Sequence, residues 1–197
     1  MKKRIAFFDF DGTITTRDTL LEMIKYQKGV FSFYLGFLLC SPFLLAWKLK
    51  MISNQRAKEI TLRWFFSKMP LASFQERCDA FAAAMIDGLV RPKALTEIEK
   101  LKAAGAEIVI VSASADNWIQ QWCGRHGLQL IATKLEISNE RLTGRIEGRN
   151  CHGQEKVRRI TAAYTLSQYD EVYCYGDTKG DKPMLSLATF RFYRPFR

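Results

Sequence analysis

The chain has little of the residue chemistry that redox centres and zinc sites use. Its five cysteines include no C-x-x-C pair, and it has only two histidines, His126 and His152. The odd number of cysteines, several of them inside apolar stretches, favours reduced core residues of a cytosolic protein over disulfides, a redox pair or a zinc site. We interpret the two histidines as structural or solvated residues, not as metal ligands.

The 197 residues also lack repeats, low-complexity tracts and a flexible linker, and they are enough for one domain plus an insertion. The chain starts with MKKRIAFFDFDG, in which aspartates interrupt the apolar region early. We therefore expect no secretory signal.

Acidic residues are scarce relative to basic ones, at 20 against 30, and the net charge is +10. Such a charge attracts anions, which include phosphorylated metabolites, anionic membrane surfaces and nucleic acids. We expect no nucleic-acid partner, because the aromatic residues lie in apolar runs and are not interleaved with basic residues.

Outside residues 14–90, the apolar pattern alternates between strand and helix. Short apolar runs predict buried parallel strands, and the segments between them show helical spacing. The predicted strands are 4–10, 106–111, 128–133, 171–175 and 189–193. The predicted helices are 93–104, 116–126, 153–164 and a short one from Lys182, and a hairpin is predicted at 135–137 and 142–146. This alternation predicts an α/β fold, a doubly wound parallel sheet.

Residues 14–90 contain no strand pattern and predict an all-helical insertion after the first strand. Apolar residues recur at helical spacing in 55–66 and 74–85. We therefore divide the chain into an α/β core, residues 1–13 and 91–197, and a helical cap, residues 14–90.

Four polar clusters follow the predicted strands or open a predicted helix. They are DFDGT at 9–13, Ser112 after an apolar run, Lys156 at the start of a helix, and GDTKGD at 176–181. Open α/β sheets bind ligands at the carboxyl ends of their strands. Clustered carboxylates there need a metal ion or a proton in order to coexist.

The first cluster offers two carboxylates with different roles. Residues two apart in an extended chain face the same way, so Asp9 and Asp11 are expected in one pocket. An ionised aspartate can attack phosphorus, and a second carboxyl group can deliver a proton to the leaving group. Gly12 allows a tight turn, and the Thr13 hydroxyl can cap the turn or bind phosphate.

The last cluster offers oxygen ligands for a cation. Asp177 and Asp181 lie four residues apart in a glycine-containing loop, and with Asp9 they form an all-oxygen set, which favours Mg²⁺ over zinc. Asp181 has an alternative role as the cap of the helix that follows it.

The remaining two clusters offer phosphate ligands. The Ser112 hydroxyl and the backbone N–H groups that follow it, starting at Ala113, can hold phosphate oxygens. Ser114 is the alternative hydroxyl. Lys156 supplies a compact positive charge against both phosphate and Asp9.

With these four motifs in this order, the chain resembles the haloacid dehalogenase superfamily, over about two-thirds of its length. An insertion between the first motif and the second strand is similar to the C1-capped subfamily IB, which includes phosphoserine phosphatases. The resemblance implies that Asp9 is the nucleophile and Asp11 the general acid and base. It also implies Mg²⁺ held by Asp9, the Asp11 backbone carbonyl and Asp177, with Asp181 in support. An acid at position 11 disfavours dehalogenase chemistry.

Three positions depart from the phosphoserine phosphatase pattern. Asp18 stands where those enzymes usually have a glutamate that contacts the substrate amine, and here it has an alternative role as a helix cap. Residues 112–114 read Ser-Ala-Ser in place of Ser-Gly-Gly, and residues 178–180 read Thr-Lys-Gly in place of Gly-Ala-Asn. The pattern therefore favours a phosphatase without favouring phosphoserine.

The cap contains an uncharged apolar run at residues 30–47, which is about long enough for a membrane-spanning helix. A single crossing would separate Asp9 from Asp177, so we expect Pro42 to break the run into two short arms. We favour a buried helical hairpin over an amphipathic hairpin resting on anionic lipid. Residues 24–70 carry a net charge of +7, from one acidic residue, Glu59, and eight basic ones: Lys25, Lys28, Lys48, Lys50, Arg56, Lys58, Arg63 and Lys68.

We therefore predict a Mg²⁺-dependent phosphomonoester hydrolase that acts on a small phosphorylated substrate through an aspartyl-phosphate. The alternatives are a lipid-phosphate phosphatase of the phosphatidylglycerophosphate type at the membrane surface, a phosphotransferase, and a non-catalytic module that binds anionic surfaces. The predicted location is the cytoplasm, with the cytoplasmic face of the membrane as the alternative. The particular substrate and the oligomeric state are not predicted.

Overall fold

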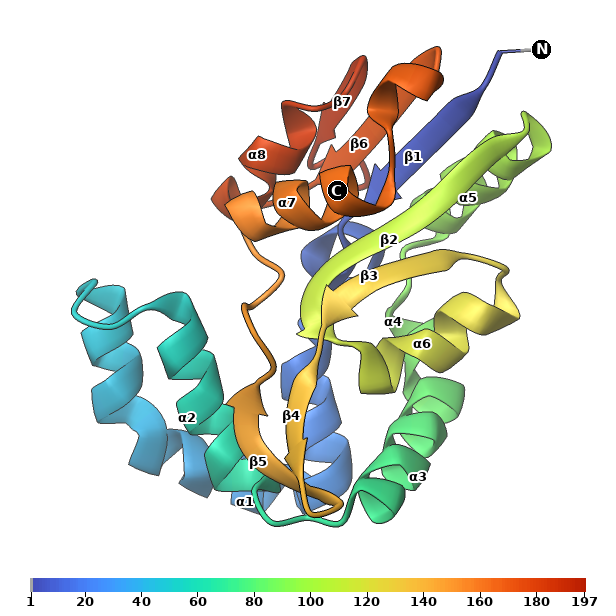
Figure 1. Cartoon of the computed structure of the whole chain (residues 1–197). Helices are drawn as coiled ribbons and strands as arrows, with labels where there is room; N and C mark the ends of the chain where they lie inside the picture. Colours follow the sequence, from blue (N-terminus) through green and yellow to red (C-terminus); the bar gives the residue numbers. More distant parts are fainter. Residues whose placement is uncertain (1) are drawn as a thin grey trace.

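Five parallel strands form the central sheet, in the order β3-β2-β1-β6-β7 (Figure 1). The computed structural model describes residues 2–197. The strands are β1 Arg4–Phe8, β2 Ala106–Ala115, β3 Gln129–Thr133, β6 Glu171–Gly176 and β7 Phe190–Tyr193. The predicted α/β fold with a parallel sheet is confirmed, because each apolar run became a strand. The side chains of the central strands β1, β2 and β6 are largely buried on both faces, whereas the edge strands β3 and β7 are more exposed.

Helices cover both faces of this sheet, as the alternation of strands and helices predicts. Ala6, Phe8 and Ile110 point to the face that α5 (Pro92–Ala103) and α6 (Asp116–Arg125) cover. Ile5 and Phe7 point to the other face, where α7 (Gln154–Ala163) and α8 (Lys182–Leu185) lie. The alternation along β1 thus divides the core between two helical layers.

Strand β2 is longer than its apolar run predicts. It continues past Ser112 to Ala115, and its pairing with β3 shifts register between Ser112 and Ala115. Such an irregularity bends a strand and re-aims its side chains. As a result, Ala113 and Ser114 fall out of the pairing with β3, which Ser112 and Ala115 keep.

The helical insertion comprises α1 (Thr19–Lys48), α2 (Asn54–Phe66), α3 (Leu71–Phe81) and α4 (Asp87–Leu89). A hairpin of β4 (Leu135–Ser138) and β5 (Arg141–Ile146) lies beside it, with Asn139 and Glu140 in the turn as predicted. The Lys68 amide donates to the Leu142 carbonyl at 2.7 Å, which ties the end of α2 to β5. The division into core 1–13 and 91–197 and cap 14–90 stays a prediction, and the hairpin packs on the cap side of it.

The expected break of the apolar run at Pro42 is wrong. Helix α1 passes through Pro42, and its kink lies at Gly29, whose φ of 80° and ψ of 162° are not helical. Proline removes the N–H that would bond to the Leu38 carbonyl. The Ser41 hydroxyl donates to that carbonyl at 2.7 Å instead, so the helix continues without an unpaired group.

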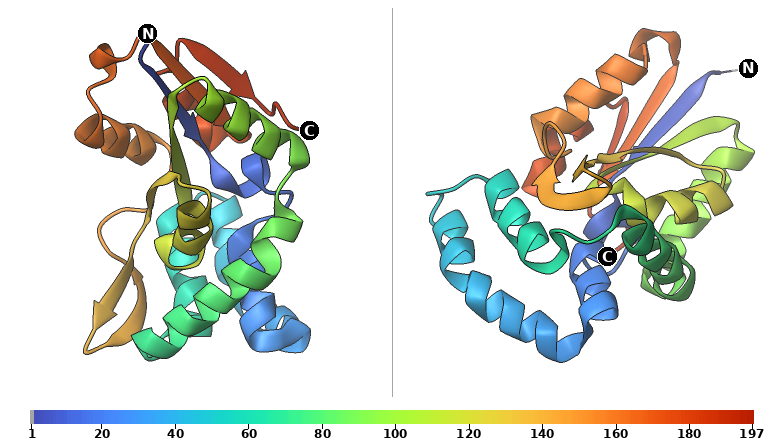
Figure 2. Two further views of the ribbon diagram at one scale, coloured as in Figure 1. Left: turned by 90° about the vertical axis from the view of Figure 1, so that its right-hand side faces the viewer. Right: turned by 60° about the horizontal axis from the view of Figure 1, so that its bottom comes forward.

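The expectation of a buried hairpin within the apolar run is also wrong. The second half of α1 pairs with α2, and it runs along the outer edge of the molecule (Figure 2). Only 17% of the most apolar 18-residue window of this helix is buried, with a mean hydropathy of 1.9. By length and composition alone, α1 is long and apolar enough to cross a membrane.

All five cysteines are free and buried. Burial raises the pKa of the Cys123 and Cys174 thiols to about 12, so these side chains stay protonated at neutral pH. The cysteines are therefore core residues, as predicted.

Candidate active site

The site begins where β1 ends. The Asp9 amide donates to the Tyr175 carbonyl at 2.9 Å, which holds Asp9 beside the end of β6. The chain then turns sharply through residues 10–14, with Gly12 at φ 79°. A Cβ atom on Gly12 would lie 2.7 Å from Asp177 Oδ2. Only glycine, which has no Cβ atom, lets this turn pass so close to Asp177.

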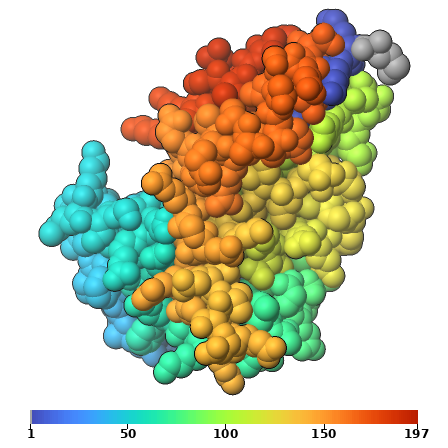
Figure 3. All heavy atoms as spheres, viewed as in Figure 1, coloured from blue at the N-terminus to red at the C-terminus, as the bar shows by residue number. Residues whose placement is uncertain are grey.

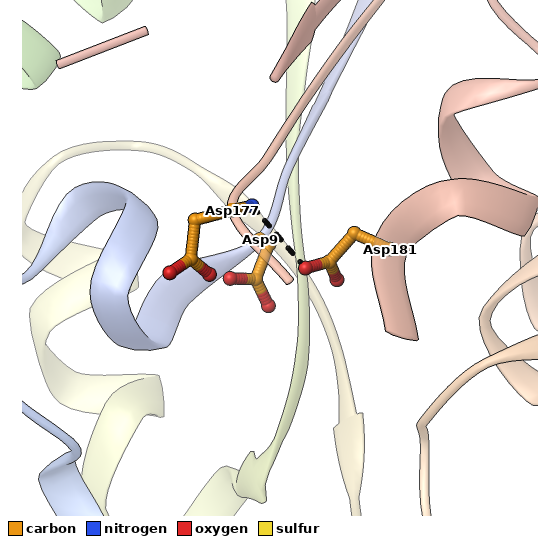
Figure 4. Close-up of side chains that lie close together, drawn as sticks. All are labelled: Asp9, Asp177 and Asp181. Atoms are coloured by element: carbon orange, nitrogen blue, oxygen red, sulfur yellow. Dashed lines mark hydrogen bonds between the residues drawn. The ribbon is translucent and has the colours of Figure 1, made fainter. Parts of the chain in front are cut away.

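Three carboxylates from three segments converge at these strand ends (Figure 4). Asp9 follows β1, Asp177 follows β6, and Asp181 stands just before α8. All three are buried, and one oxygen atom of each lies within 4.8 Å of those of the other two. Asp181 Oδ2 also accepts hydrogen bonds from the Thr178 amide at 2.9 Å and from the Thr178 hydroxyl at 2.7 Å. Asp181 therefore belongs to the cluster and closes a capping box with Thr178 at the short helical turn 179–181. Its side chain makes no cap hydrogen bond to α8, so the role considered for it as the cap of the following helix is wrong.

Lys156 supplies a positive charge to this cluster from the start of α7. Its Nζ lies 2.5 Å from Asp9 Oδ1 and 2.7 Å from Asp181 Oδ1, and its side chain is 1% exposed. Burial by itself lowers the pKa of Lys156, but the two carboxylates outweigh it and raise that pKa above its ordinary value. Lys156 is therefore a permanent cation in the site.

The cluster carries more negative charge than Lys156 compensates. Burial raises the pKa of Asp9 to about 7, and the nearby Lys156 lowers it only in part. Arg197 adds a partly exposed ion pair to Asp177 Oδ2. Three buried carboxylates facing one buried ammonium group favour a further cation. Because every donor is an oxygen, the residues fit Mg²⁺ better than zinc.

Asp11 does not join the three clustered carboxylates. Its Oδ1 accepts hydrogen bonds from the Thr19 amide and the Thr19 hydroxyl, both at 2.7 Å, and its Oδ2 accepts one from the Ser114 hydroxyl at 2.6 Å. The start of α1 and the end of β2 thus fix the Asp11 carboxylate at the border of the cavity.

The hydroxyl groups predicted to bind phosphate occupy different places. The Thr13 hydroxyl donates to Asp9 Oδ2 at 2.8 Å, so it orients a carboxylate here. Ser112 is fully buried and its Oγ accepts from the Ser114 amide at 3.0 Å, whereas Ala113 and Ser114 line the cavity. The phosphate contacts of Thr13, Ser112 and Ala113 stay predictions.

Asp18 shows one of the two roles considered for it, that of a helix cap. It caps α1, because its carboxylate accepts from the Leu21 amide at 3.1 Å, and it also lines the cavity. Its contact with a substrate stays a prediction.

A cavity of about 780 Å³ lies between the cap helices and the strand ends. Asp9, Asp11 and Lys156 border its core side, and Phe37, Leu44 and Trp47 of α1 contribute an apolar wall. A second cavity of about 520 Å³, bordered by α5 and the C-terminal segment, contains none of the predicted site residues.

Lys58 of α2 is a cavity residue that the sequence did not single out. Its Nζ donates to the Ala113 carbonyl at 2.5 Å and lies 3.4 Å from Asn150 Oδ1. Desolvation lowers the pKa of Lys58, and the carboxylates of Asp18 and Asp11 oppose that shift. No motif surrounds Lys58, so its only sequence signal was its place among the basic residues of the cap.

Comparisons with known proteins agree with this architecture. The family described as haloacid dehalogenase-like hydrolase matches residues 6–186. Protein CicA of Caulobacter vibrioides is 34% identical over 196 residues, which cover 98% of this chain and 86% of that protein. A histidinol-phosphatase of Neisseria meningitidis is 28% identical over 131 residues, which cover 63% of this chain and 58% of that protein.

The fold is similar to that of a solved phosphoserine phosphatase, determined as a phospho-aspartyl intermediate analogue. The TM-score is 0.69 with 18% sequence identity, and the match covers 97% of this chain and 86% of that one.

Proposed function

This chain belongs to the haloacid dehalogenase-like hydrolase family, and from that premise we propose that it is a Mg²⁺-dependent phosphatase of phosphomonoesters. The observation that carries the proposal is the convergence of Asp9, Asp177 and Asp181 on Lys156 at the strand ends. The histidinol-phosphatase relative and the phosphoserine phosphatase fold support phosphoryl chemistry at this place.

Asp9 is the proposed nucleophile. Lys156 holds its Oδ1 and Thr13 holds its Oδ2, so the carboxylate is oriented before a substrate arrives. An Asp9 oxygen forms a bond to phosphorus while the bond from phosphorus to the alcohol oxygen breaks, and an aspartyl-phosphate results. Mg²⁺, held by Asp9, the Asp11 carbonyl and Asp177 with Asp181 in support, would neutralise charge on the phosphoryl oxygens.

Asp11 is the proposed acid and base. It gives its proton to the leaving alcohol oxygen, and it later takes a proton from the water that attacks the aspartyl-phosphate. That second attack releases inorganic phosphate and restores the Asp9 carboxylate. One Asp11 oxygen must leave its Thr19 or Ser114 donor for these steps, and Asp11 already borders the cavity.

We propose that the remaining phosphate contacts come from Ser112, Ala113 and Ser114, with Lys58 above them from the cap. Lys58 places a cation on the cap side of the cavity, where it can meet a phosphate oxygen or another anionic group of the substrate. Which small phosphorylated compound is hydrolysed is not assigned. We propose a cytoplasmic location, because all five cysteines are free.

A second candidate function is the hydrolysis of a lipid phosphate. Phe37, Leu44 and Trp47 form an apolar wall in the same cavity that Asp9 and Lys156 border. Such a wall would fit the acyl chain of a lipid phosphate. The full set of site residues counts against an inert binding module.

The test is turnover of a panel of phosphomonoesters with and without Mg²⁺, for the parent and for Asp9→Asn. We expect the parent to require Mg²⁺ and Asp9→Asn to lose essentially all turnover while remaining folded. Asp79→Asn makes the same chemical change outside the cavity and should keep parental turnover. An active Asp9→Asn enzyme would falsify the covalent mechanism.

A further inference from the structure

The second half of α1 has two apolar faces, of which only one is covered. Phe33, Gly36 and Cys40 are buried, and Phe37 packs against Phe65 of α2 with ring centroids 5.8 Å apart. The opposite side, here called the outer face, is exposed to solvent. It consists of Val30, Phe31, Tyr34, Leu35, Leu38 and Leu39.

The outer face is a continuous stripe, because its residues recur at the three- and four-residue spacing of one side of a helix. Phe31 is 81% exposed, Leu38 is 68% exposed and Tyr34 is 65% exposed. A helix that is apolar all round is normally covered by protein or by lipid. A contiguous apolar patch of this kind marks an interaction site. Figure 3 shows the tip of the cap helices as a lobe that projects from the rest of the molecule.

The charges beside the outer face select its partner. Residues 23–58 contain no acidic residue, and basic side chains lie before the face at Lys25 and Lys28 and beyond it at Lys48 and Lys50. Two copies of this chain joined through the face would bring these like charges together. A bilayer with anionic headgroups offers the opposite charge at its surface and apolar chains beneath.

The outer face and the cavity share one helix. Phe37, Leu44 and Trp47 turn toward the cavity, and Phe31 and Leu38 turn away from it. Because α1 packs on α2 in this position, it would lie in the membrane interface without crossing the bilayer. Asp9 before it and Asp177 after it then stay in one site on one side of the membrane.

We propose that the outer face docks the protein on an anionic lipid bilayer, and that the cavity receives a phosphomonoester whose apolar part lies in that bilayer. The proposal about the substrate rests on the proposed phosphatase function. The docking itself does not.

Docking is tested by co-sedimentation of the full-length protein with vesicles of phosphatidylcholine, with and without phosphatidylglycerol. We expect the parent to bind the anionic vesicles and not the neutral ones. Phe31→Gln combined with Leu38→Gln should weaken binding at least about tenfold, because two large apolar side chains no longer enter the lipid. Ile137→Gln, an exposed apolar residue of β4, should bind like the parent.

Two further measurements decide between lipid and a second copy. Charge reversal by Lys48→Glu with Lys50→Glu should weaken binding to anionic vesicles, and circular dichroism should match the parent for every variant. Sedimentation velocity should show a monomer in the absence of lipid. The proposal is overturned if the parent protein does not bind anionic vesicles, or if it forms a stable dimer that buries Phe31 and Leu38.

The substrate half is tested by comparing glycerol 3-phosphate in solution with phosphatidic acid in vesicles. We expect a higher kcat/KM for the vesicle substrate, lost in the Phe31→Gln and Leu38→Gln double variant, while turnover of p-nitrophenyl phosphate is unchanged. Vesicle binding without any phosphomonoester hydrolysis would reject the phosphatase function and leave docking intact. Hydrolysis of soluble phosphomonoesters without vesicle binding would reject docking and leave the phosphatase function intact.

Discussion

Replacing Lys156 by methionine tests the electrostatic balance of the site most directly. The change keeps the length of the side chain and removes the one buried cation among Asp9, Asp177 and Asp181. Lys156 is 1% exposed and makes ion pairs at 2.5 Å and 2.7 Å, so its loss leaves buried carboxylates uncompensated. Breaking a buried pair from one side costs about 3–5 kcal/mol.

A loss of that size is a large part of the about 5–15 kcal/mol by which a domain is stable. We expect the midpoint of thermal unfolding, without added metal, to fall by roughly 6–20 °C in Lys156→Met. Mg²⁺ should recover part of the loss, because a cation bound to the folded state alone stabilises it. Lys182→Met makes the same change at an exposed position and should alter stability by less than about 0.5 kcal/mol.

A double-mutant cycle with Asp181→Asn separates the charge effect from lost packing. Asparagine keeps an oxygen acceptor for Thr178 but carries no charge, so the double variant should be more stable than the sum of the single losses predicts. Urea denaturation of the four proteins gives this coupling energy. Two results would refute the inference that Lys156 compensates the charge of the buried carboxylates. One is a loss of unfolding free energy below about 1 kcal/mol in Lys156→Met, and the other is a loss in the double variant equal to the sum of the two single losses.

Three other predictions follow from local geometry. Gly12→Ala places a Cβ atom 2.7 Å from Asp177 Oδ2 at a positive φ, so calorimetry should show weaker Mg²⁺ binding and a stability loss of about 1–3 kcal/mol. Gly36→Ala brings a Cβ atom within 2.3 Å of Phe65, and the unfolding free energy should fall by about 1–3 kcal/mol as α1 is pushed from α2. Hydrogen bonds from two arginines lower the pKa of Glu155 to about 2, so its stabilisation is present above about pH 4.5 and lost as the pH falls toward 2. Because those arginines are partly exposed, the unfolding free energy of the parent at pH 6, measured by urea denaturation, should exceed that of Glu155→Gln by only about 1 kcal/mol. The same difference in unfolding free energy at pH 3 would contradict this prediction.

The sheet and its helices were predictable because their signals are local. Each strand is an apolar run, and each core helix carries apolar residues at helical spacing, so both follow from a few neighbouring side chains. The end of β2 was not predictable. Its extension to Ala115 depends on a register shift against β3, a strand that lies elsewhere in the sequence.

The apolar run in the cap shows where local rules fail. Proline predicts a break at residue 42, yet the Ser41 hydroxyl pairs the carbonyl that proline leaves free, and the kink forms at Gly29. The predicted burial failed for a different reason. Composition shows that the helix is apolar, but the number of neighbours that cover it depends on the whole fold.

The candidate site also contains residues that the sequence predicted and one that it did not. Motif spacing identified Asp9, Asp11, Lys156 and the two later aspartates as candidates, because metal and phosphate chemistry needs those residue types at strand ends. Lys58 has no such spacing. It reaches the cavity only because α2 folds over the end of β2 and its Nζ meets the Ala113 carbonyl.

By itself, the sequence determined the strands, the core helices and the candidate residues for binding a cation and a phosphoryl group, because these depend on side-chain chemistry and short-range periodicity. Tertiary structure alone decided that Asp11 turns away from the other carboxylates toward Thr19 and Ser114. It also decided that one side of α1 borders the cavity while the other faces solvent. Both outcomes depend on contacts between distant segments, which no local pattern encodes.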